Sequence, residues 1–439
     1  MEDRSYLCID LKSFYASVEC IDRGLDPMEA RLVVADPSRT EKTICLAVSP
    51  ALKALGVRNR CRVFEIPAGI DYITASPRMA RYIERSADVY SVYLRYIAPE
   101  DIHVYSIDEA FMDVTPYLEL YGTSARELGE RIRADVAKTT GIPAACGLGT
   151  NLYLAKVALD ITAKKSEDFF GELTEESYRQ TLWHHRPLTD FWRIGERIAA
   201  RLERMGIHDM AELALAPPEM LYREFGIDAE IMIDHAWGAE PVRMEHIKAY
   251  RGKTSSLSTA QVLARGYSFD EARTLVREMA ESLALELVDK GKLAAGVHVH
   301  VGYEMTAEQR AFARSSGTRA AWYKATSFDG GTRHFPAPTA ARPEIVEAAL
   351  EVYDERISRS APIKRIGLTV GDLTDADASG VQLSFADLDA GRDEDRKRQK
   401  AVLAVKRKFG KNALLKGTDL LPEATQRERN EQIGGHKSG

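Results

Sequence analysis

Short apolar runs of strand type alternate with apolar residues at helical spacing in the first 170 residues. Four segments read as strands: 6–9, 102–107, 111–114 and 143–150. Three segments carry helical spacing: one that begins around Ser13, 124–138 and 151–165. Ser124 and Glu127 have the spacing of a capping box, which predicts where the second of these helices begins. The alternation predicts a ferredoxin-like sheet with helices packed on it.

The pattern changes twice before residue 254. Residues 31–35 and 43–48 read as strands of a small α/β insertion that ends near Ser76. From 171 to 240 the pattern is mostly that of short helices. Residues 241–253 are polar and basic, which predicts a linker. The N-terminal part of the chain therefore divides into several modules.

A second alternation of strands and helices extends from 254 to 373. It predicts a strand, a helix over 268–290, strands over 295–303 and 319–328, a helix over 343–357 and a strand over 363–373. This is a β-α-β-β-α-β order, with a partly looped middle because 304–343 is rich in Gly, Ser, Thr and Pro. Residues 374–439 predict a charged tail with one helix, whose apolar face is formed by Val402, Val405 and Phe409.

Length and composition indicate a globular, multidomain protein. The 439 residues are too many for one ordinary core, and 45% hydrophobic with 29% charged residues is a globular balance. Because the net charge is −6, a nucleic-acid partner would require basic residues gathered on one surface. Five cysteines without a Cys-x-x-Cys pair predict reduced thiols and a cytoplasmic location. No apolar run reaches membrane-spanning length.

Three carboxylates follow strand-type runs and are candidate metal ligands. Asp10 follows the run 6–9, and Asp108 and Glu109 follow the run 102–107. Mg²⁺ prefers oxygen ligands, and two such ions can clamp an in-line phosphoryl displacement. Because successive strand residues face opposite ways, Asp108 and Glu109 can serve one site only if the chain turns there. A hairpin tip near 108–109 meets that condition. A surface turn with two solvated acids is the alternative for this pair.

The segments around these acids resemble motifs of a known family. Residues 10–15 and 106–111 resemble the two palm motifs of Y-family DNA polymerases, the lesion-bypass class. Residues 147–164 are similar to the third palm motif, and 425–437 is similar to the UmuC-type bacterial branch. The resemblance runs from about residue 5 to the end of the sequence.

The resemblance implies an α+β multidomain fold with the right-hand arrangement of a polymerase. It has a ferredoxin-like palm (1–13 and 77–170), small fingers (14–76) and a helical thumb with a helix-hairpin-helix (171–240). These are followed by a linker (241–253), a βαββαβ little finger (254–373) and a charged tail (374–439). The implied partners are primer-template DNA and a dNTP, with two Mg²⁺ ions as cofactors and a monomeric state.

The resemblance also implies roles for residues near the acids. Asp10 and Asp108 would bridge two metal ions, Glu109 would bind the ion that activates the primer 3′-OH, and the Leu11 carbonyl would bind the ion on the nucleotide side. Phe14 and Tyr15 lie at the predicted start of a helix, whose N–H groups suit triphosphate oxygens. Tyr15 matches the steric gate that excludes a ribose 2′-OH.

Two lysines match positions that contact the nucleotide in the family, each with a departure from the pattern. Lys164 matches a triphosphate-contacting lysine, although its spacing from Lys156 is one residue longer than in some relatives. Lys53 stands where many relatives have arginine, and Pro50 stands where they have tyrosine. Because lysine cannot form arginine's bidentate fork, a plain solvated lysine remains the alternative at Lys53.

Two segments are predicted to contact DNA. Arg193, Ile194 and Gly195 resemble the turn of a helix-hairpin-helix, which offers backbone N–H groups to a phosphate. The family pattern has glycine where this chain has Arg193, so an ordinary turn of a helical bundle remains the alternative. The linker supplies four further basic residues: Arg243, Lys248, Arg251 and Lys253.

A short peptide in the tail predicts a further partner. Gln382, Leu383, Ser384 and Phe385 resemble the peptide by which bacterial polymerases bind the sliding clamp, in a shortened form. Ordinary tail sequence is the alternative. The sequence therefore predicts a template-directed, Mg²⁺-dependent lesion-bypass DNA polymerase. A palm-type nucleotidyl cyclase and a non-catalytic DNA-binding scaffold are the two rival hypotheses.

Overall fold

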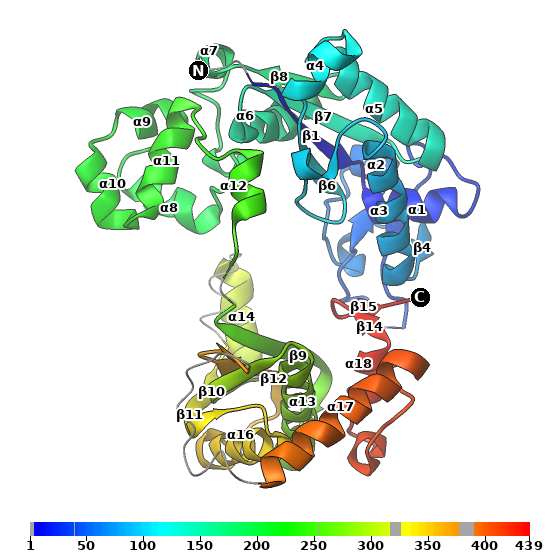
Figure 1. The fold of residues 1–439 in the computed structure, drawn as a ribbon, viewed down its shortest axis with the longest axis vertical. Coiled ribbons are helices and arrows are strands. Elements are labelled where there is room, and N and C mark those ends of the chain that lie inside the picture. The colour runs from blue at the N-terminus through cyan, green and yellow to red at the C-terminus, as the bar shows by residue number, and fades with distance from the viewer. Residues whose placement is uncertain (1–3, 39, 253, 317–325, 377–389) are drawn as a thin grey trace. The chain divides into compact units, whose positions relative to one another are not determined.

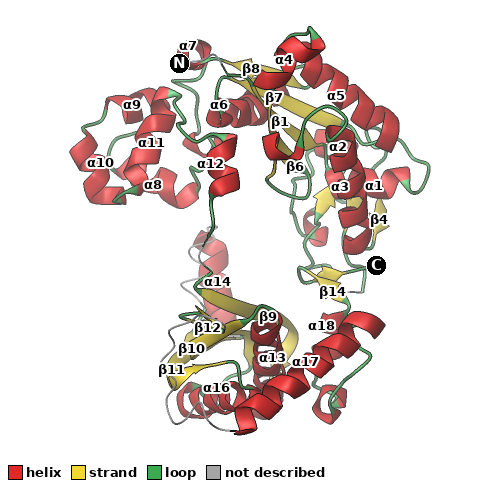
Figure 2. Ribbon diagram, viewed as in Figure 1, coloured by secondary structure: helices red, strands yellow, loops and turns green. Residues whose placement is uncertain are grey.

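The structure is a computed structural model that describes residues 4–38, 40–252, 254–316, 326–376 and 390–439 (Figure 1). These residues form two compact units. The N-terminal unit is Met1–Arg251 with His436–Gly439, and the C-terminal unit is Gly252–Gly435. Figure 2 shows that each unit combines helices and strands.

A five-stranded sheet organises the N-terminal unit, in the order β5-β6-β1-β7-β8. Neighbours pair antiparallel except β7 and β8, which are parallel. The strands are β1 (Tyr6–Leu11), β5 (Ile102–Val104), β6 (Glu109–Asp113), β7 (Ala144–Gly149) and β8 (Phe170–Leu173). The predicted strands are present, but β5 ends at Val104 instead of 107, and β8 extends the sheet past the boundary predicted at 170.

Helices pack on both faces of this sheet. α5 (Ala125–Thr140) begins at the capping box of Ser124 and Glu127, as predicted, and packs against β7 and α3 (Met79–Tyr93). α6 (Leu152–Val157) packs on β7 at the glycines of the third motif, where a Cβ at Gly147 would lie 2.1 Å from the Ala155 carbonyl oxygen. These glycines therefore bring α6 close to the sheet backbone. The predicted helix over 151–165 continues as a π-helix over Ala158–Thr162 and a 3₁₀ turn over Ala163–Lys165.

A small module is inserted between β1 and α3. Its strands are β2 (Leu32–Val34), β3 (Ala47–Val48) and β4 (Ile73–Ala75), and its helices are α1 (Phe14–Ile21) and α2 (Pro50–Ala54). β2 pairs with β3 antiparallel and with β4 parallel. A small core of its own includes Val33, Cys45, Leu52 and Cys61. The α/β insertion predicted from the sequence is thus present.

Short helices follow the sheet, as the sequence predicts. They are α7 (Glu175–Thr181), α8 (Glu196–Arg204), α9 (Met210–Leu215), α10 (Pro218–Phe225) and α11 (Asp228–Trp237). α12 (Met244–Ala249) forms in the middle of the predicted linker over 241–253 and packs on β5. Met244 is buried in a cluster with Tyr6 and Phe111. The polar and basic composition of 241–253 gave no sign of this buried contact.

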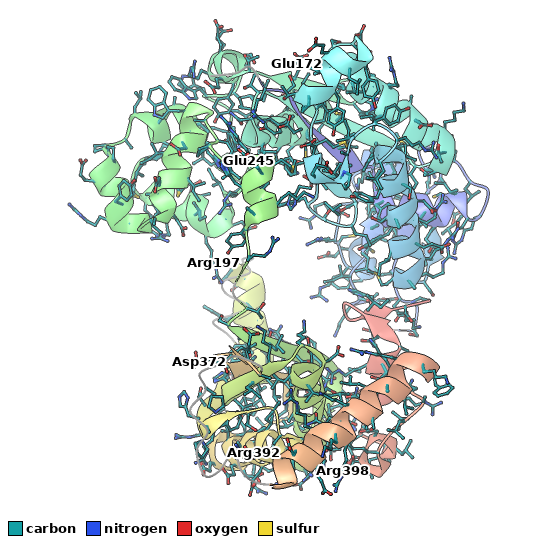
Figure 3. All side chains as sticks on the ribbon, in the orientation of Figure 1. Glu172, Arg197, Glu245, Asp372, Arg392 and Arg398 are labelled. Carbon is teal, nitrogen blue, oxygen red and sulfur yellow. The ribbon has the colours of Figure 1, made fainter. Side chains whose placement is uncertain are left out.

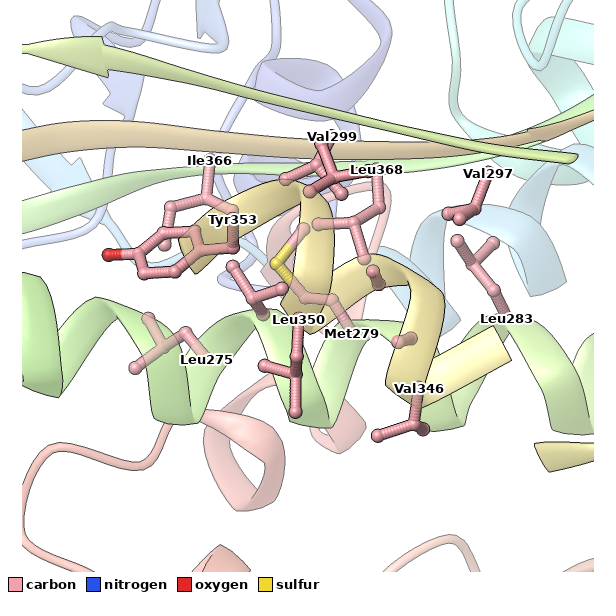
Figure 4. Packing of buried hydrophobic residues seen from close by; sticks show 14 of the residues in the cluster. Leu275, Met279, Leu283, Val297, Val299, Val346, Leu350, Tyr353, Ile366 and Leu368 are labelled. Carbon is pink, nitrogen blue, oxygen red and sulfur yellow. The ribbon is translucent and has the colours of Figure 1, made fainter. Parts of the chain in front are cut away.

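The C-terminal unit contains a sheet in the order β11-β10-β12-β9, with two helices against one face. The strands are β9 (Ser256–Tyr267), β10 (Lys292–Tyr303), β11 (Phe328–Thr339) and β12 (Ile363–Gly371). The helices are α13 (Phe269–Asp289) and α16 (Arg342–Arg356). Figure 4 shows the core between them, with Met279 of α13 and Leu350 of α16 facing Val299 and Leu368 of the sheet.

The middle of this unit differs from the prediction. The strand predicted over 319–328 falls mostly on 317–325, which lie outside the described residues; β11 begins at Phe328, and α14 (Ala307–Ser316) was not predicted. β11 contains Gly330 and Pro336, which usually argue against a strand. It lies at the edge of the sheet, where a missing N–H donor is tolerated.

The predicted tail helix is α17 (Ala390–Phe409), which carries Arg392 and Arg398 (Figure 3). Its predicted apolar face is wrong at Phe409, whose side chain is 66% exposed. Polar contacts fix this helix instead, because Asp395 accepts from the Arg342 N–H at 2.9 Å and Gln399 donates to the Ala340 carbonyl at 3.0 Å. The remaining elements are β13 (Thr374–Asp375), α18 (Gln426–Asn430), β14 (Gln432–Ile433) and β15 (His436–Lys437).

Across the described parts of the chain, every helix is too short or too polar to cross a membrane.

Candidate active site

The register of β1 and β6 brings two of the predicted acids together. Asp10 lies directly opposite Glu109 in the antiparallel pair. Because directly opposed residues share one face of a sheet, both side chains point to the same side. Cys8 and Phe111 lie on that face too, in the cluster that packs against α6. The strands therefore aim both carboxylates toward the α6 side of the sheet.

Asp108 lies in the turn before β6. The turn begins after β5 ends at Val104, and the Asp108 carbonyl accepts from the Leu11 N–H at 2.9 Å. The Ser106 hydroxyl donates to Asp108 Oδ1 at 2.6 Å and so fixes the carboxylate. The hairpin tip predicted at 108–109 is confirmed. Because Asp108 precedes β6, its side chain need not point to the face opposite Glu109.

Glu109 is held by a buried lysine. Lys156 Nζ lies 2.9 Å from Glu109 Oε1 and 2.9 Å from Asp160 Oδ2. The Cys8 thiol also donates to Glu109 Oε1, at 3.2 Å. Burial favours a neutral amine, but the charges of Asp160 and Glu109 outweigh it and raise the pKa of Lys156. Lys156 is therefore a fixed cation beneath the site.

Burial and the neighbouring acids favour the protonated form of Asp10. Burial, together with the charges of Asp108 and Glu109, raises the pKa of Asp10 to about 7. A divalent cation would relieve that repulsion, and the donors are all oxygen, which suits Mg²⁺. As the side chains stand, no three His, Cys, Asp or Glu groups of the described residues converge on a metal position. Glu109 directs Oε1 at Lys156, so metal binding requires its second oxygen or a rotation of the side chain.

Two aromatic residues begin α1, next to these acids. Ser13 occupies the N-cap position with a left-handed φ of 47° and no side-chain capping hydrogen bond, and Phe14 is buried. Tyr15 is half-buried and packs against the ring of Tyr82. Burial and the charge of Asp108 raise the pKa of Tyr15.

Three lysines line the same region. Lys53 Nζ donates to the Ser13 hydroxyl at 2.8 Å, and burial and the charge of Lys164 lower its pKa while Asp10 raises it. Burial and the charge of Lys53 lower the pKa of Lys12 to about 8. Lys164 lies 3.6 Å from Asp160 and is exposed. These cations could neutralise a polyphosphate beside the acids.

The predicted hairpin turn has a strained residue at its centre. Arg193 has a φ of 71°, a left-handed conformation that favours glycine. Gly195 is the N-cap of α8, and a Cβ built on it meets no atom within 4 Å. Ile194 is buried, so its side chain cannot contact DNA while the turn is folded. Arg193 and Gly195 are exposed, whereas the Ile194 N–H donates to the Phe191 carbonyl at 3.1 Å.

The basic residues predicted to bind DNA from 243–253 are mostly engaged within the chain. Lys248 Nζ donates to the Pro99 carbonyl at 2.8 Å and to that of Ile102, and these contacts anchor α12. Arg251 donates to the Lys248 carbonyl at 2.6 Å. Arg243 precedes α12 and is half-buried. Lys253 and the peptide Gln382–Phe385 lie outside the described residues.

Sequence reasoning missed four side chains that build this site: Lys12, Ser106, Tyr82 and Lys156. Lys12 and Lys156 stand inside the quoted motifs, and Lys156 precedes Asp160 by four residues, the spacing of a helical ion pair. That spacing was a usable signal. Tyr82 has no such signal in the sequence, because it reaches the site only through the packing of α3 against α1.

Comparisons with known proteins agree with this arrangement. A family model described as the impB/mucB/samB family matches residues 9–160, and one described as that family's C-terminal domain matches 254–385. The putative UV-damage repair protein UvrX of Bacillus subtilis (strain 168) is 28% identical over 440 residues, which cover 99% of this chain and 98% of that protein.

Two further relatives link the sequence and the fold. A DNA polymerase IV of Moorella thermoacetica is 32% identical over 294 residues, which cover 64% of this chain and 69% of that protein. A solved chimera of Y-family DNA polymerases superposes with a TM-score of 0.61 at 18% identity, covering 84% of this chain and 99% of that one. This likeness confirms the predicted α+β multidomain fold.

Proposed function

The chain belongs to the Y family of DNA polymerases, and on that basis we propose that it copies damaged template bases by two-metal nucleotidyl transfer. The observation that carries the proposal is the opposition of Asp10 and Glu109 with Asp108 in the adjoining turn. That arrangement places three carboxylates at one end of the sheet, where divalent cations would offset their negative charge.

The acids have distinct tasks in this proposal. Asp10 and Asp108 would share two Mg²⁺ ions, with Glu109 on the primer side and the Leu11 carbonyl on the nucleotide side. The ions would activate the primer 3′-OH and stabilise the leaving pyrophosphate. Ser106 orients Asp108 through its 2.6 Å hydrogen bond. Lys156 holds Glu109 in place through its 2.9 Å ion pair.

The start of α1 and the lysines would hold the nucleotide. The backbone N–H groups of Phe14 and Tyr15, at the start of α1, would donate hydrogen bonds to triphosphate oxygens. Lys53 and Lys164 would neutralise the phosphates, with Lys12 as an additional cation found from the structure. Tyr15 would exclude a ribose 2′-OH because its ring occupies the space beside the sugar. Selection of the sugar would therefore be steric.

We propose that the parts of the chain correspond to the domains of Y-family polymerases. The sheet of β1 and β5 to β8 would be the palm, the insertion over 14–76 the fingers, the helices over 171–240 the thumb and the sheet of β9 to β12 the little finger. DNA phosphates would meet the turn at Arg193 to Gly195 and basic residues of the C-terminal unit. Small fingers would enclose the nascent pair loosely, which permits damaged templates at a cost in fidelity.

Primer extension tests the proposal. Wild type should extend a primer on an undamaged template and past a lesion, and Asp108→Ala should abolish both activities while keeping DNA affinity. Template-free turnover of a nucleotide would indicate a cyclase instead. DNA binding without extension would indicate a scaffold.

A clamp arm of the same assay tests the tail peptide. Gln382→Ala with Phe385→Ala should remove any stimulation by the sliding clamp without changing basal extension. Equal stimulation of this variant and wild type would leave Gln382–Phe385 as ordinary tail sequence.

A further inference from the structure

Residues 436–439 lie on the N-terminal unit although they follow the C-terminal unit in sequence. Lys437 Nζ lies 2.9 Å from Asp36 Oδ1 and 2.8 Å from the Ser38 hydroxyl. The Ala80 N–H, in the first turn of α3, donates to the Ser438 carbonyl at 2.8 Å. The Lys437 side chain thus contacts the loop after β2, and the Ser438 carbonyl contacts the start of α3.

The Asp36 carboxylate is built to receive a cation. It is 6% exposed and accepts from the Ser38 N–H at 3.0 Å and from the Ser38 hydroxyl at 2.6 Å. Burial opposes its ionisation, but the hydrogen bonds from Ser38 and Lys437 lower the pKa of Asp36. A buried carboxylate that remains charged is stabilised by a nearby cation, and Lys437 supplies one.

The Ser438 contact completes the start of a helix. The first N–H groups of an α-helix have no partner within the helix, and Ala80 is the second residue of α3. Gly439 lies so close to Arg78 that an added Cβ would be 2.9 Å from the Arg78 Cβ. The backbone of 438–439 therefore packs flat against the beginning of α3.

The glycines before this segment give the chain its turn. Gly434 and Gly435 have φ values of 59° and 80°, both left-handed. Residues with a Cβ adopt two such conformations in succession only with backbone strain. The sequence Ile433 to Lys437, which resembles the UmuC-type branch, thus combines a turn with the lysine that reaches Asp36.

We propose that residues 436–439 are a releasable latch whose binding site is Asp36, Ser38 and the first turn of α3. The latch is releasable because Lys437 is half-exposed, so water can replace Asp36 as the partner of its ammonium group. It closes readily because the covalent connection makes binding intramolecular. The segment 252–435 is joined to the N-terminal unit by the chain at 251–252, and the closed latch adds a second attachment. The latch thereby regulates the freedom of the C-terminal unit.

Hydrogen exchange at the Ala80 amide tests the contact directly. Lys437→Glu and deletion of 436–439 should raise the exchange rate of that amide about tenfold or more, since each ~1.4 kcal/mol of lost closure is tenfold. Lys437→Arg should retain protection. Lys411→Glu, which makes the same charge change at another exposed lysine, is the matched control and should leave Ala80 protected. Unchanged exchange in both Lys437→Glu and the deletion would overturn the latch.

A double-mutant cycle isolates the ion pair. Asp36→Asn and Lys437→Met should each raise Ala80 exchange, and the double variant should exchange no faster than the more affected single variant. Strictly multiplicative effects would show that the two residues act independently. Small-angle scattering of the full chain gives the second readout: the distance distribution should broaden in Lys437→Glu but not in Lys411→Glu. Identical distributions for wild type and Lys437→Glu would mean that the segment restrains nothing.

Discussion

The rings of Tyr15 and Tyr82 stack with centroids 4.4 Å apart and planes inclined by 17°. Tyr82 is fully buried, and its hydroxyl donates to Glu19 Oε1 at 2.8 Å. Glu19 in turn accepts from Arg78 Nε at 2.9 Å. The ring proposed as the sugar gate is therefore fixed from behind by α3, which turns a mobile aromatic side chain into a rigid wall.

Removing the gate should relax sugar selection without ending chemistry. In Tyr15→Ala the clash with a 2′-OH disappears while the acids remain, so we expect ribonucleotide incorporation to rise about 10²–10³-fold, equivalent to a few kcal/mol. Tyr15→Phe keeps the ring and should remain selective. Single-nucleotide incorporation with matched dNTP and rNTP measures both. Unchanged discrimination in Tyr15→Ala would show that Tyr15 is not the gate.

Lys156 should stabilise the N-terminal unit through Glu109. Lys156→Met removes the cation that Glu109 and Asp160 share, and loss of one partner of a buried ion pair costs about 3 kcal/mol. The loss should be smaller in a Glu109→Gln background, because one of the unpaired charges is then absent. Thermal unfolding of the four proteins in the cycle measures the coupling. Equal losses in the two backgrounds would contradict the pairing of Lys156 with Glu109.

Glu278 should make the C-terminal unit less stable at higher pH. It is 1% exposed on α13, and its Oε1 finds no hydrogen-bond partner among the described residues. Burial raises its pKa to about 7, assisted by the charge of Asp419 and opposed by hydrogen bonds from Thr425 and Gln426 and by the charge of Arg429. Since the folded pKa exceeds the unfolded value, stability is full below about pH 4.5 and declines as pH rises through 7.

Glu278→Gln is the test of that decline. The amide stays neutral, so the variant should lose the pH dependence and gain up to about 3 kcal/mol over wild type at pH 8. Glu281→Gln, one turn away and paired with Lys416 at 2.7 Å, is the control and should not gain stability. Parallel unfolding curves of wild type and Glu278→Gln from pH 5 to 8 would exclude the effect.

The sequence was sufficient where local rules decide the structure. Strand alternation and the turn after β5 place Asp10 and Glu109 together, and the capping box of Ser124 marks the start of α5. Local rules fail where distant contacts decide. β11 contains Pro336 and becomes a strand because it occupies an edge, which only the assembled sheet defines. Tyr82 joins the site only because α3 packs against α1.

Arg193 tests whether the turn before α8 contacts DNA. Its left-handed φ of 71° costs roughly 1–2 kcal/mol for a residue with a Cβ, whereas glycine there costs about 0.5–1 kcal/mol of extra chain entropy on folding. Arg193→Gly should therefore stabilise the fold by about 0.5 kcal/mol, while Arg193→Ala retains the strain and should not.

Both Arg193 variants lose the same charge, so their DNA affinities differ only through the backbone. If the N–H groups around Gly195 bind a phosphate, glycine at 193 permits closer approach, and Arg193→Gly should bind primer-template DNA more tightly than Arg193→Ala. Both should show a shallower salt dependence than wild type, because one phosphate contact is lost. Titration of labelled primer-template at several salt concentrations measures each. Identical affinities of the two variants, with a wild-type salt slope, would mean that this turn is an ordinary bend in a helical bundle and that DNA is held elsewhere.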